Sequence, residues 1–241
     1  MKYIVNQIAD LQASGQNETL LTVLINTITR HGSAADAQQL LPLFLQTKDA
    51  RLLLPIQAHG NMQMADEIFA HAIQDGALKE DFPHETLIAL GYLQHAPTER
   101  VLIEYYKNLF ENKGDWDQHV AVCLALLNFP CRGYEAIIKQ QIEKCLQDWL
   151  FPEMIPALAV KTGDNTLGEK LYHHGSTKAS SDASAGLILG IALFGCEKRE
   201  LFKNIILNPD WEAASTGTGN IRYTMMGMSF LNITFGELFA D

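Results

Sequence analysis

The chain of 241 residues has few basic side chains, with 18 lysines and arginines against 28 acidic residues and a net charge of −10. Nucleic-acid binding depends on basic side chains that displace counterions from phosphates, so this balance disfavours a nucleic-acid partner. It disfavours an anionic membrane surface for the same electrostatic reason. A basic protein is the natural complement of an acidic surface, and we therefore expect a protein partner of that kind.

Cysteine is also scarce. The four cysteines form no CxxC pair and no spacing typical of a zinc site. They are Cys123, Cys131, Cys145 and Cys196. Two of them stand where a helix would place small apolar residues, so we expect reduced thiols in a cytoplasmic protein, with no metal and no cofactor.

Long apolar runs are missing as well. The longest weakly polar run, Ala185 to Cys196, is shorter than the about 20 apolar residues that a membrane-spanning helix needs. Gly186 and Gly190 in this run form a GxxxG pattern, which in so short a segment indicates close helix packing. The segment that follows Met1 becomes polar too soon for a signal peptide. We expect a soluble protein.

Catalytic signatures are absent too. The sequence contains no GxSxG elbow, no HExxH pair and no Walker-type lysine. The Gly-Thr-Gly at 217–219 is too sparse for a phosphate-binding loop and follows no expected strand. These absences favour a binding protein over an enzyme, and no residue is assigned a catalytic role.

The chain does contain a recurring pattern, a break in an apolar helical run. Six times an apolar run ends at a small or turn-forming residue, and a second amphipathic run follows. The breaks stand at Gly32, Gly60, Ala96, Pro130, Gly163 and Gly195, with spacings of 28, 36, 34, 33 and 32 residues. A period in this range is typical of stacked-repeat proteins.

Each repeat reads as two helices joined by a tight turn. Pro97 suits the first turn of a helix, and the stripe from Val101 to Leu109 then has helical spacing. The pair with its break at Gly163 begins with an expected helix over Met154–Val160. We find no strand pattern bounded by hairpin turn residues. The sequence predicts an all-α solenoid of about six to seven stacked antiparallel pairs, forming one domain over residues 1–241.

The two ends differ from the repeats. Lys2–Ala13 fits a capping helix, and the apolar segment Asn220–Phe239 fits a terminal helix. A helix that is apolar most of the way round is either packed or a docking surface, and its scattered methionines favour packing.

Three histidines precede a break directly: His31, His59 and His95. Aligned by stacking, they would form a ladder suited to a metal or to pH sensing. Local capping is the simpler interpretation, because a histidine at a helix C-terminus complements the dipole and a following glycine adopts the left-handed cap. His31-Gly32, His59-Gly60 and His174-Gly175 fit that pattern.

The segment Ala89–Pro97, continued by Val101–Ile103, resembles the HEAT-like repeat superfamily, in its short phycobilisome-lyase-like variety. Ile188–Gly195 and Leu124–Leu127 repeat the first half of the pattern, and Asp164 matches the aspartate that opens the family's inter-helix turn. Most copies lack that aspartate. The resemblance implies a HEAT-like α-solenoid, in a superfamily that contains adaptors, scaffolds, bilin-lyase subunits and a DNA-repair glycosylase branch.

Our functional hypothesis is a helical-repeat scaffold, adaptor or inhibitor, with a bacterial immunity-type protein as one case. The predicted contact residues are Glu67, Glu104, Lys107, Glu143 and Trp116. Trp116 lies between two aspartates. These aspartates could form a contact site around Trp116 or an acid/base pair. We prefer the interpretation that they complement the dipole of the following helix. A small-molecule-modifying solenoid of the bilin-lyase type is the alternative, and a HEAT-type glycosylase is a third that the acidity disfavours.

Overall fold

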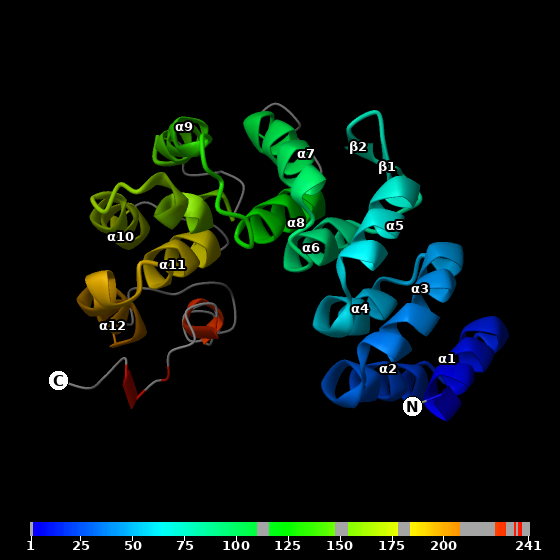
Figure 1. Cartoon of the computed structure of the whole chain (residues 1–241). Coiled ribbons are helices and arrows are strands. Elements are labelled where there is room, and N and C mark those ends of the chain that lie inside the picture. The colour runs from blue at the N-terminus through cyan, green and yellow to red at the C-terminus, as the bar shows by residue number, and fades with distance from the viewer. Residues whose placement is uncertain are drawn as a thin grey trace. The chain divides into compact units, whose positions relative to one another are not determined.

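The computed structural model describes residues 2–109, 116–147, 154–177, 184–207, 225–229, 234 and 236–237. These residues are predominantly helical (Figure 1), which confirms the all-α fold class. The chain divides into two compact units, Met1–Leu102 and Ile103–Asp241, and each is described by itself. The single domain expected over residues 1–241 stays a prediction. No helix of the described ranges has the length and apolar character needed to cross a membrane.

The N-terminal unit contains short helices joined by tight connections. Its elements are α1 (Lys2–Ser14), α2 (Glu18–His31), α3 (Ala34–Thr47), the 3-10 helix η1 (Ala50–Leu52), α4 (Leu53–His59), α5 (Met62–Ala72), β1 (Ile73–Gln74), β2 (Ala77–Leu78), α6 (Glu85–Tyr92) and the start of α7 (Ala96–Lys107). The expected capping helix at Lys2–Ala13 corresponds to α1.

Alternate helices of this unit contact one another. α4 contacts α2 and α6, while α3 contacts α1 and α5. The helices therefore form two rows, α2–α4–α6 and α1–α3–α5, as the blue-to-cyan part of Figure 1 shows. The first helix of each pair lies in one row and the second helix in the other.

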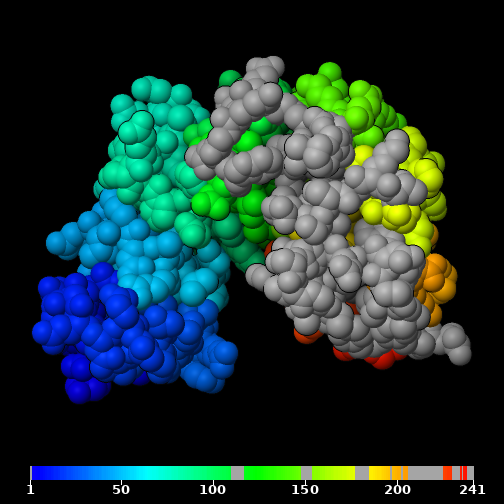
Figure 2. All heavy atoms as spheres, turned by 180° about the vertical axis from the view of Figure 1, so that it is seen from behind, coloured from blue at the N-terminus to red at the C-terminus, as the bar shows by residue number. Residues whose placement is uncertain are grey.

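The apolar faces of the two rows form one core. Ile25 of α2, Phe44 of α3 and Ile56 of α4 are completely buried in it. Seen from behind, the atoms of these helices lie in close contact (Figure 2). Burying a large apolar side chain stabilises a fold by about 1.5–3 kcal/mol, so this core supplies most of the drive to pack the pairs.

The C-terminal unit continues the plan of paired helices. Its elements are the end of α7, α8 (Trp116–Leu126), α9 (Glu135–Cys145), the 3-10 helix η2 (Ile155–Thr162), α10 (Leu167–Thr177), α11 (Ser184–Ala192), the 3-10 helix η3 (Gly195–Lys198) and α12 (Arg199–Leu207). Here η2 contacts α8 and α11, while α10 contacts α12. Four of the six expected breaks, Gly32, Gly60, Pro130 and Gly163, fall between the two helices of a pair, whereas Ala96 is the first residue of α7 and Gly195 the first residue of η3.

Two glycine breaks have a different cause from the one expected. Gly32 and Gly60 follow α2 and α4, but their φ values of −78° and −68° are not left-handed. A Cβ at Gly60 would lie 2.3 Å from the Ile56 carbonyl oxygen, and one at Gly32 would lie 2.5 Å from that of Ile28. The glycines are required by close approach of the backbone. Gly175 is no cap either, because it lies inside α10.

The helix expected over Met154–Val160 is instead the 3-10 helix η2. Such a long 3-10 helix is uncommon, because its hydrogen bonds are less well aligned than those of an α-helix. Pro156 stands at its start, and Gly190 of α11 lies against the Pro156 carbonyl, where a Cβ would be 2.4 Å from the oxygen. This close contact confirms the packing role predicted for Gly190.

A small hairpin also corrects the expectation that no hairpin turn is present. β1 and β2 pair antiparallel, with Ile73 opposite Leu78. Asp75 and Gly76 form the turn with φ values of 52° and 79°. Asp-Gly favours a two-residue turn with two positive φ angles, so this dipeptide indicates a hairpin turn. The flanking strands are too short to show an alternating apolar pattern in the sequence.

Most of the expected terminal helix at Asn220–Phe239 lies outside the described residues. Within 225–229, a Cβ at Gly227 would be 2.4 Å from the Cβ of Ala192 in α11, and Met228 is buried. Met225 is exposed. This short stretch packs on α11, in line with the packing preferred for the segment.

Candidate functional site

Two of the five predicted contact residues lie together. Glu104 and Lys107 are on α7, and Lys107 Nζ is 2.7 Å from Glu104 Oε1. The backbone oxygen of Lys107 also accepts a hydrogen bond of 2.8 Å from Gln141 Nε2 of α9. A partner that uses Lys107 or Glu104 would therefore have to replace an existing ion pair.

The other predicted contact residues are dispersed. Glu67 is half-buried on α5, and Glu143 is exposed on α9. Asp164 raises the pKa of Lys139 by a hydrogen bond and by its charge, and Glu143 adds a smaller effect of the same sign. Trp116 is the first residue of α8, but its side chain lies outside the described residues.

Acidic residues of the N-terminal unit are concentrated in its second half. Residues 1–62 contain four acidic and four basic residues, whereas residues 63–102 contain seven acidic and two basic ones. The seven are Asp66, Glu67, Asp75, Glu80, Asp81, Glu85 and Glu99. We call residues 63–102 the acidic segment. Its local net charge of −5 is the whole net charge of the unit.

In residues 1–62, some charged side chains are held in ion pairs with side chains of opposite charge. Arg51 of η1 binds Asp49, with Nη2 2.6 Å from Oδ2, and also binds Glu18 of α2. Burial opposes ionisation of Asp49, but hydrogen bonds from Arg51 and Gln12 outweigh it and lower the pKa of Asp49. By contrast, Asp75, Glu80, Asp81 and Glu85 are exposed and pair with no other described residue.

One member of the acidic segment is held by a buried histidine. His95 Nε2 is 3.1 Å from Asp66 Oδ1 on α5, and His95 Nδ1 is 2.8 Å from the Thr98 hydroxyl. The imidazole also packs on Phe69, with ring centroids 4.7 Å apart. A neutral imidazole that donates from Nε2 to Asp66 accepts from Thr98 at Nδ1, so both ring nitrogens are satisfied.

The order carboxylate, imidazole, hydroxyl is that of a nucleophilic triad. Thr98, however, is completely buried, while the Asp66 side chain is 67 % exposed. A hydroxyl that no substrate can reach cannot act as a nucleophile. The cluster therefore links α5 to the start of α7 and positions the Asp66 carboxylate on the surface.

The three histidines have different roles, which corrects the ladder pattern. His31 is exposed at the end of α2, and His95 directly precedes α7 instead of ending α6. His59 Nε2 lies 3.0 Å from the Ile28 oxygen and 3.1 Å from the Thr29 oxygen. It therefore reaches terminal carbonyls of the neighbouring α2. No three histidine, cysteine, aspartate or glutamate side chains in the described ranges are grouped to hold a metal ion.

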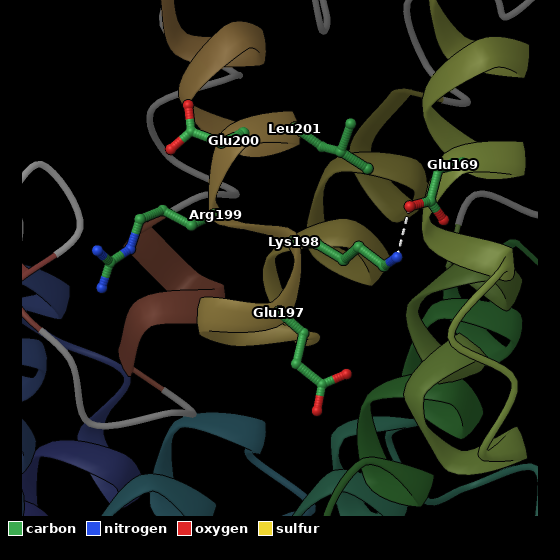
Figure 3. Close-up of a pocket in the computed structure, with 6 residues that line it drawn as sticks. All are labelled: Glu169, Glu197, Lys198, Arg199, Glu200 and Leu201. Carbon is green, nitrogen blue, oxygen red and sulfur yellow. Dashed lines mark hydrogen bonds and ion pairs between the residues drawn. The ribbon is translucent and has the colours of Figure 1, made fainter. Parts of the chain in front are cut away.

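Two adjoining open hollows lie on the surface of the C-terminal unit. One, of about 430 Å³, is lined by α10, η3 and the start of α12 (Figure 3). The second, of about 480 Å³, shares Glu169 and Lys198 with it. Lys198 points toward Glu169 and binds it at 2.5 Å, which lowers the pKa of Glu169 although burial opposes the shift.

Lys198 reaches Glu169 because α10 carries a glycine beneath its stem. A Cβ at Gly168 would lie 2.9 Å from Lys198 Cε. Arg199 and Glu200 point to the opposite side (Figure 3), so the polar groups do not converge on one position. An enzyme or a small-molecule site needs an enclosed pocket with converging polar groups. These hollows do not have that arrangement.

Three thiols of the C-terminal unit that the structure describes are buried. Cys123, Cys131 and Cys145 are buried, and burial raises the pKa of Cys123 far above its usual range. Tyr106 is buried among the same groups, and its pKa is raised mainly by burial. The thiolate is the reactive form of cysteine, so a thiol kept protonated serves as an apolar side chain. The side chain of Cys196 lies outside the described residues.

Sequence reasoning missed two features of the N-terminal unit. The clustering of acids within residues 63–102 is readable from the sequence, but a whole-chain charge conceals it. The contact between Asp66 and His95 spans 29 residues and depends on packing. Only the contact between His95 and Thr98, which are three residues apart, could have been predicted from the sequence.

Comparison of this chain with protein-family models, with curated proteins and with solved structures found no match.

Proposed function

We propose that the protein is a HEAT-like α-solenoid that binds a basic protein partner through the acidic segment of its N-terminal unit. One observation carries the proposal: the whole net charge of that unit lies in residues 63–102. A surface of one sign attracts a partner of the opposite sign and speeds its association.

The solenoid half of the proposal is supported by how the helices contact one another. In the N-terminal unit each helix contacts the next but one, so that α2, α4 and α6 form one row and α1, α3 and α5 the other. In the C-terminal unit η2 bridges α8 and α11 in the same manner. Such a pattern is expected when pairs that cannot bury their apolar faces alone are stacked.

The binding half is supported by the exposure of the acids. Asp75 lies at the hairpin turn, Glu80 and Asp81 follow the hairpin, and Glu85 begins α6. All four are exposed, so they meet a partner without breaking contacts within the protein. Glu67 of the predicted contact set belongs to the same segment, whereas Glu104, Lys107, Glu143 and Trp116 remain separate predictions.

The role that fits is that of an adaptor, scaffold or inhibitor, of which an immunity-type protein is one form. Catalysis is not part of the proposal, because the Thr98 hydroxyl and the thiols of Cys123, Cys131 and Cys145 are buried, and the His59 and His95 rings are held in structural contacts. The small-molecule alternative gains no specific observation from the open hollows on α10 and α12.

The test is affinity capture from a lysate of the source cells, with quantitative mass spectrometry. The wild-type chain is compared with Asp75→Asn/Glu80→Gln/Asp81→Asn, and with the control Asp10→Asn/Asp117→Asn/Glu197→Gln, which removes three exposed charges elsewhere. We expect a stoichiometric basic protein with the wild type and the control, and at least about tenfold weaker recovery with the acidic-segment variant. Equal recovery by all three chains, or recovery of no stoichiometric protein, would contradict the proposal.

A further inference from the structure

The N-terminal unit exposes apolar side chains mainly on one row of helices. Val23 of α2, Leu54 of α4 and Tyr92 of α6 are 53, 41 and 49 % exposed, and Leu20 lies beside Val23. The other row exposes only Tyr3 and Met62 among its large apolar residues. We call Val23, Leu54 and Tyr92 the apolar strip.

The three residues of the strip lie on neighbouring helices. α4 contacts both α2 and α6, and the row α1–α3–α5 lies along one side of the row α2–α4–α6 (Figure 1). Val23 is on the side of α2 opposite the buried Leu21 and Ile25, and Leu54 is likewise opposite Ile56 of α4. Large apolar groups gathered on one face of a protein mark an interaction site more often than scattered ones do.

The charge beside the strip identifies the kind of partner. Glu85 stands seven residues, or two helical turns, before Tyr92 and so shares its side of α6. Glu80 and Asp81 precede this helix, and none of these three acids pairs with another described residue. The strip therefore adjoins the acidic segment, and a segment that covers it meets negative charge at the α6 end.

The backbone of the row favours a helical partner over an extended one. Helices satisfy their own N–H and C=O groups, and the carbonyl of Val23 even accepts an additional bond of 2.8 Å from Thr27 Oγ1. An extended segment would find no backbone partners here, whereas a helix brings its own hydrogen bonds. The axes of packed helices lie about 8–10 Å apart, and seven residues of a helix rise by about 10 Å along its axis. Apolar residues at seven-residue intervals on a partner helix thus match successive helices of the row.

We infer that the apolar strip binds an amphipathic helix of the partner, with the partner's lysines and arginines directed toward Glu85 and the rest of the acidic segment. This inference rests on the proposed function, because it takes the basic partner from there. It assigns the contact to the α2–α4–α6 row and not to the second helices of the pairs.

The probe is a synthetic 22-residue peptide, about two helical turns longer than the row's spacing requires. It carries leucines at seven-residue intervals with further leucines three or four residues on, and lysines elsewhere. A second peptide has glutamate in place of every lysine. Binding to the full chain is measured by fluorescence anisotropy at about 0.15 M salt.

Leu54→Gln/Tyr92→Gln tests the strip, and Tyr3→Gln/Met62→Gln on the other row is the matched control with similar or greater exposure. All four positions are exposed, so the variants keep their fold, which circular dichroism checks. We expect the strip variant to bind the lysine peptide at least about tenfold more weakly and the control to stay within about twofold. Glu85→Gln should weaken binding less and reduce its salt dependence.

The outcomes separate the two proposals. Equal losses in the strip variant and the control, or no loss in either, overturn the strip while leaving the basic partner in place. Equal binding of the glutamate peptide contradicts the basic partner. A wild-type chain that does not bind the lysine peptide overturns the strip, and the proposed function is then judged by the capture experiment, which does not use the peptide.

Discussion

The two units present different side chains at their surfaces. The N-terminal unit exposes six large apolar residues, whereas Met225 is the one in the described part of the C-terminal unit. Charged side chains of the C-terminal unit form ion pairs such as Lys139–Asp164 and Lys198–Glu169, whereas Asp75, Glu80, Asp81 and Glu85 of the acidic segment pair with no other described residue. One plan of paired helices therefore exposes more large apolar side chains in the N-terminal unit than in the described part of the C-terminal unit.

Two kinds of contact, polar side-chain links and close backbone approach, hold the helices together. In the N-terminal unit, side chains such as His59 and His95 make polar links between helices. In the C-terminal unit, glycines permit close approach: Gly190 meets Pro156, and Gly168 meets Lys198. A polar link tolerates some adjustment, but a backbone contact without space for a methyl group does not. Substitutions at the two kinds of contact should thus have effects of different size.

The largest effect is expected from Gly190→Ala. The new Cβ would lie 2.4 Å from the Pro156 carbonyl oxygen, so α11 and η2 must separate. We expect a loss of about 3 kcal/mol in the free energy of unfolding. Urea unfolding measures it, and hydrogen exchange should show the loss of protection in α11 and η2. Gly236→Ala is the control, since its nearest neighbour would be 3.7 Å away. Similar effects of the two substitutions would remove the distinction drawn for α11.

His95→Ala should have the next largest effect, in the N-terminal unit. It removes the stacking on Phe69 and leaves the buried Thr98 hydroxyl without its partner. Large-to-small changes in a core and unsatisfied buried hydroxyls each destabilise, and we expect about 2 kcal/mol together. His71→Ala on the exposed side of α5 serves as the control in the same urea experiment. A loss no larger than that of the control would show that the link is not structural.

Lys198 allows packing and charge to be separated. Its stem lies over Gly168 and its side chain is 13 % exposed, so Lys198→Ala removes apolar contact as well as the ion pair. We expect about 1 kcal/mol from Lys198→Ala and less than about half of that from Lys198→Met, which keeps the stem. Thermal unfolding of both variants gives the comparison. Equal losses would show that the ion pair with Glu169 dominates.

The smallest effect concerns acid sensitivity of the N-terminal unit. The pKa of Asp49 is lowered, so its contribution to stability is complete above its unfolded pKa of about 3.9 and is lost as the pH falls through its folded pKa. Asp49→Asn should therefore flatten the decline in the free energy of unfolding between about pH 5 and about pH 2. Asp10→Asn, at an exposed site, is the control. A curve for Asp49→Asn as steep as that of the wild type would contradict the assignment.

Periodicity predicted much of the fold, because apolar spacing and helix-breaking residues act locally. Each of the six breaks falls between two helices or at the first residue of the second one, and a helix is present where the N-terminal capping helix was expected. The predictions that were wrong concern residues whose conformation depends on packing. The element η2 is a 3-10 helix packed between α9 and α11. Gly60 is needed for close approach although its φ is not left-handed. The candidate site divides in the same way, since the acids of residues 63–102 are visible in the sequence but the exposure of Leu54 and Tyr92 is not.

The amino-acid sequence by itself determined the helical fold class, the places where helices end and the concentration of acids in one stretch, because these follow from side-chain chemistry and short-range spacing. Tertiary structure decided which groups are accessible. The hydroxyl of Thr98 is buried although its polarity would suit the surface, and Val23 is exposed although its apolarity would suit the core. Burial depends on which helices pack together, and that is settled by the sum of many contacts between residues far apart in the chain.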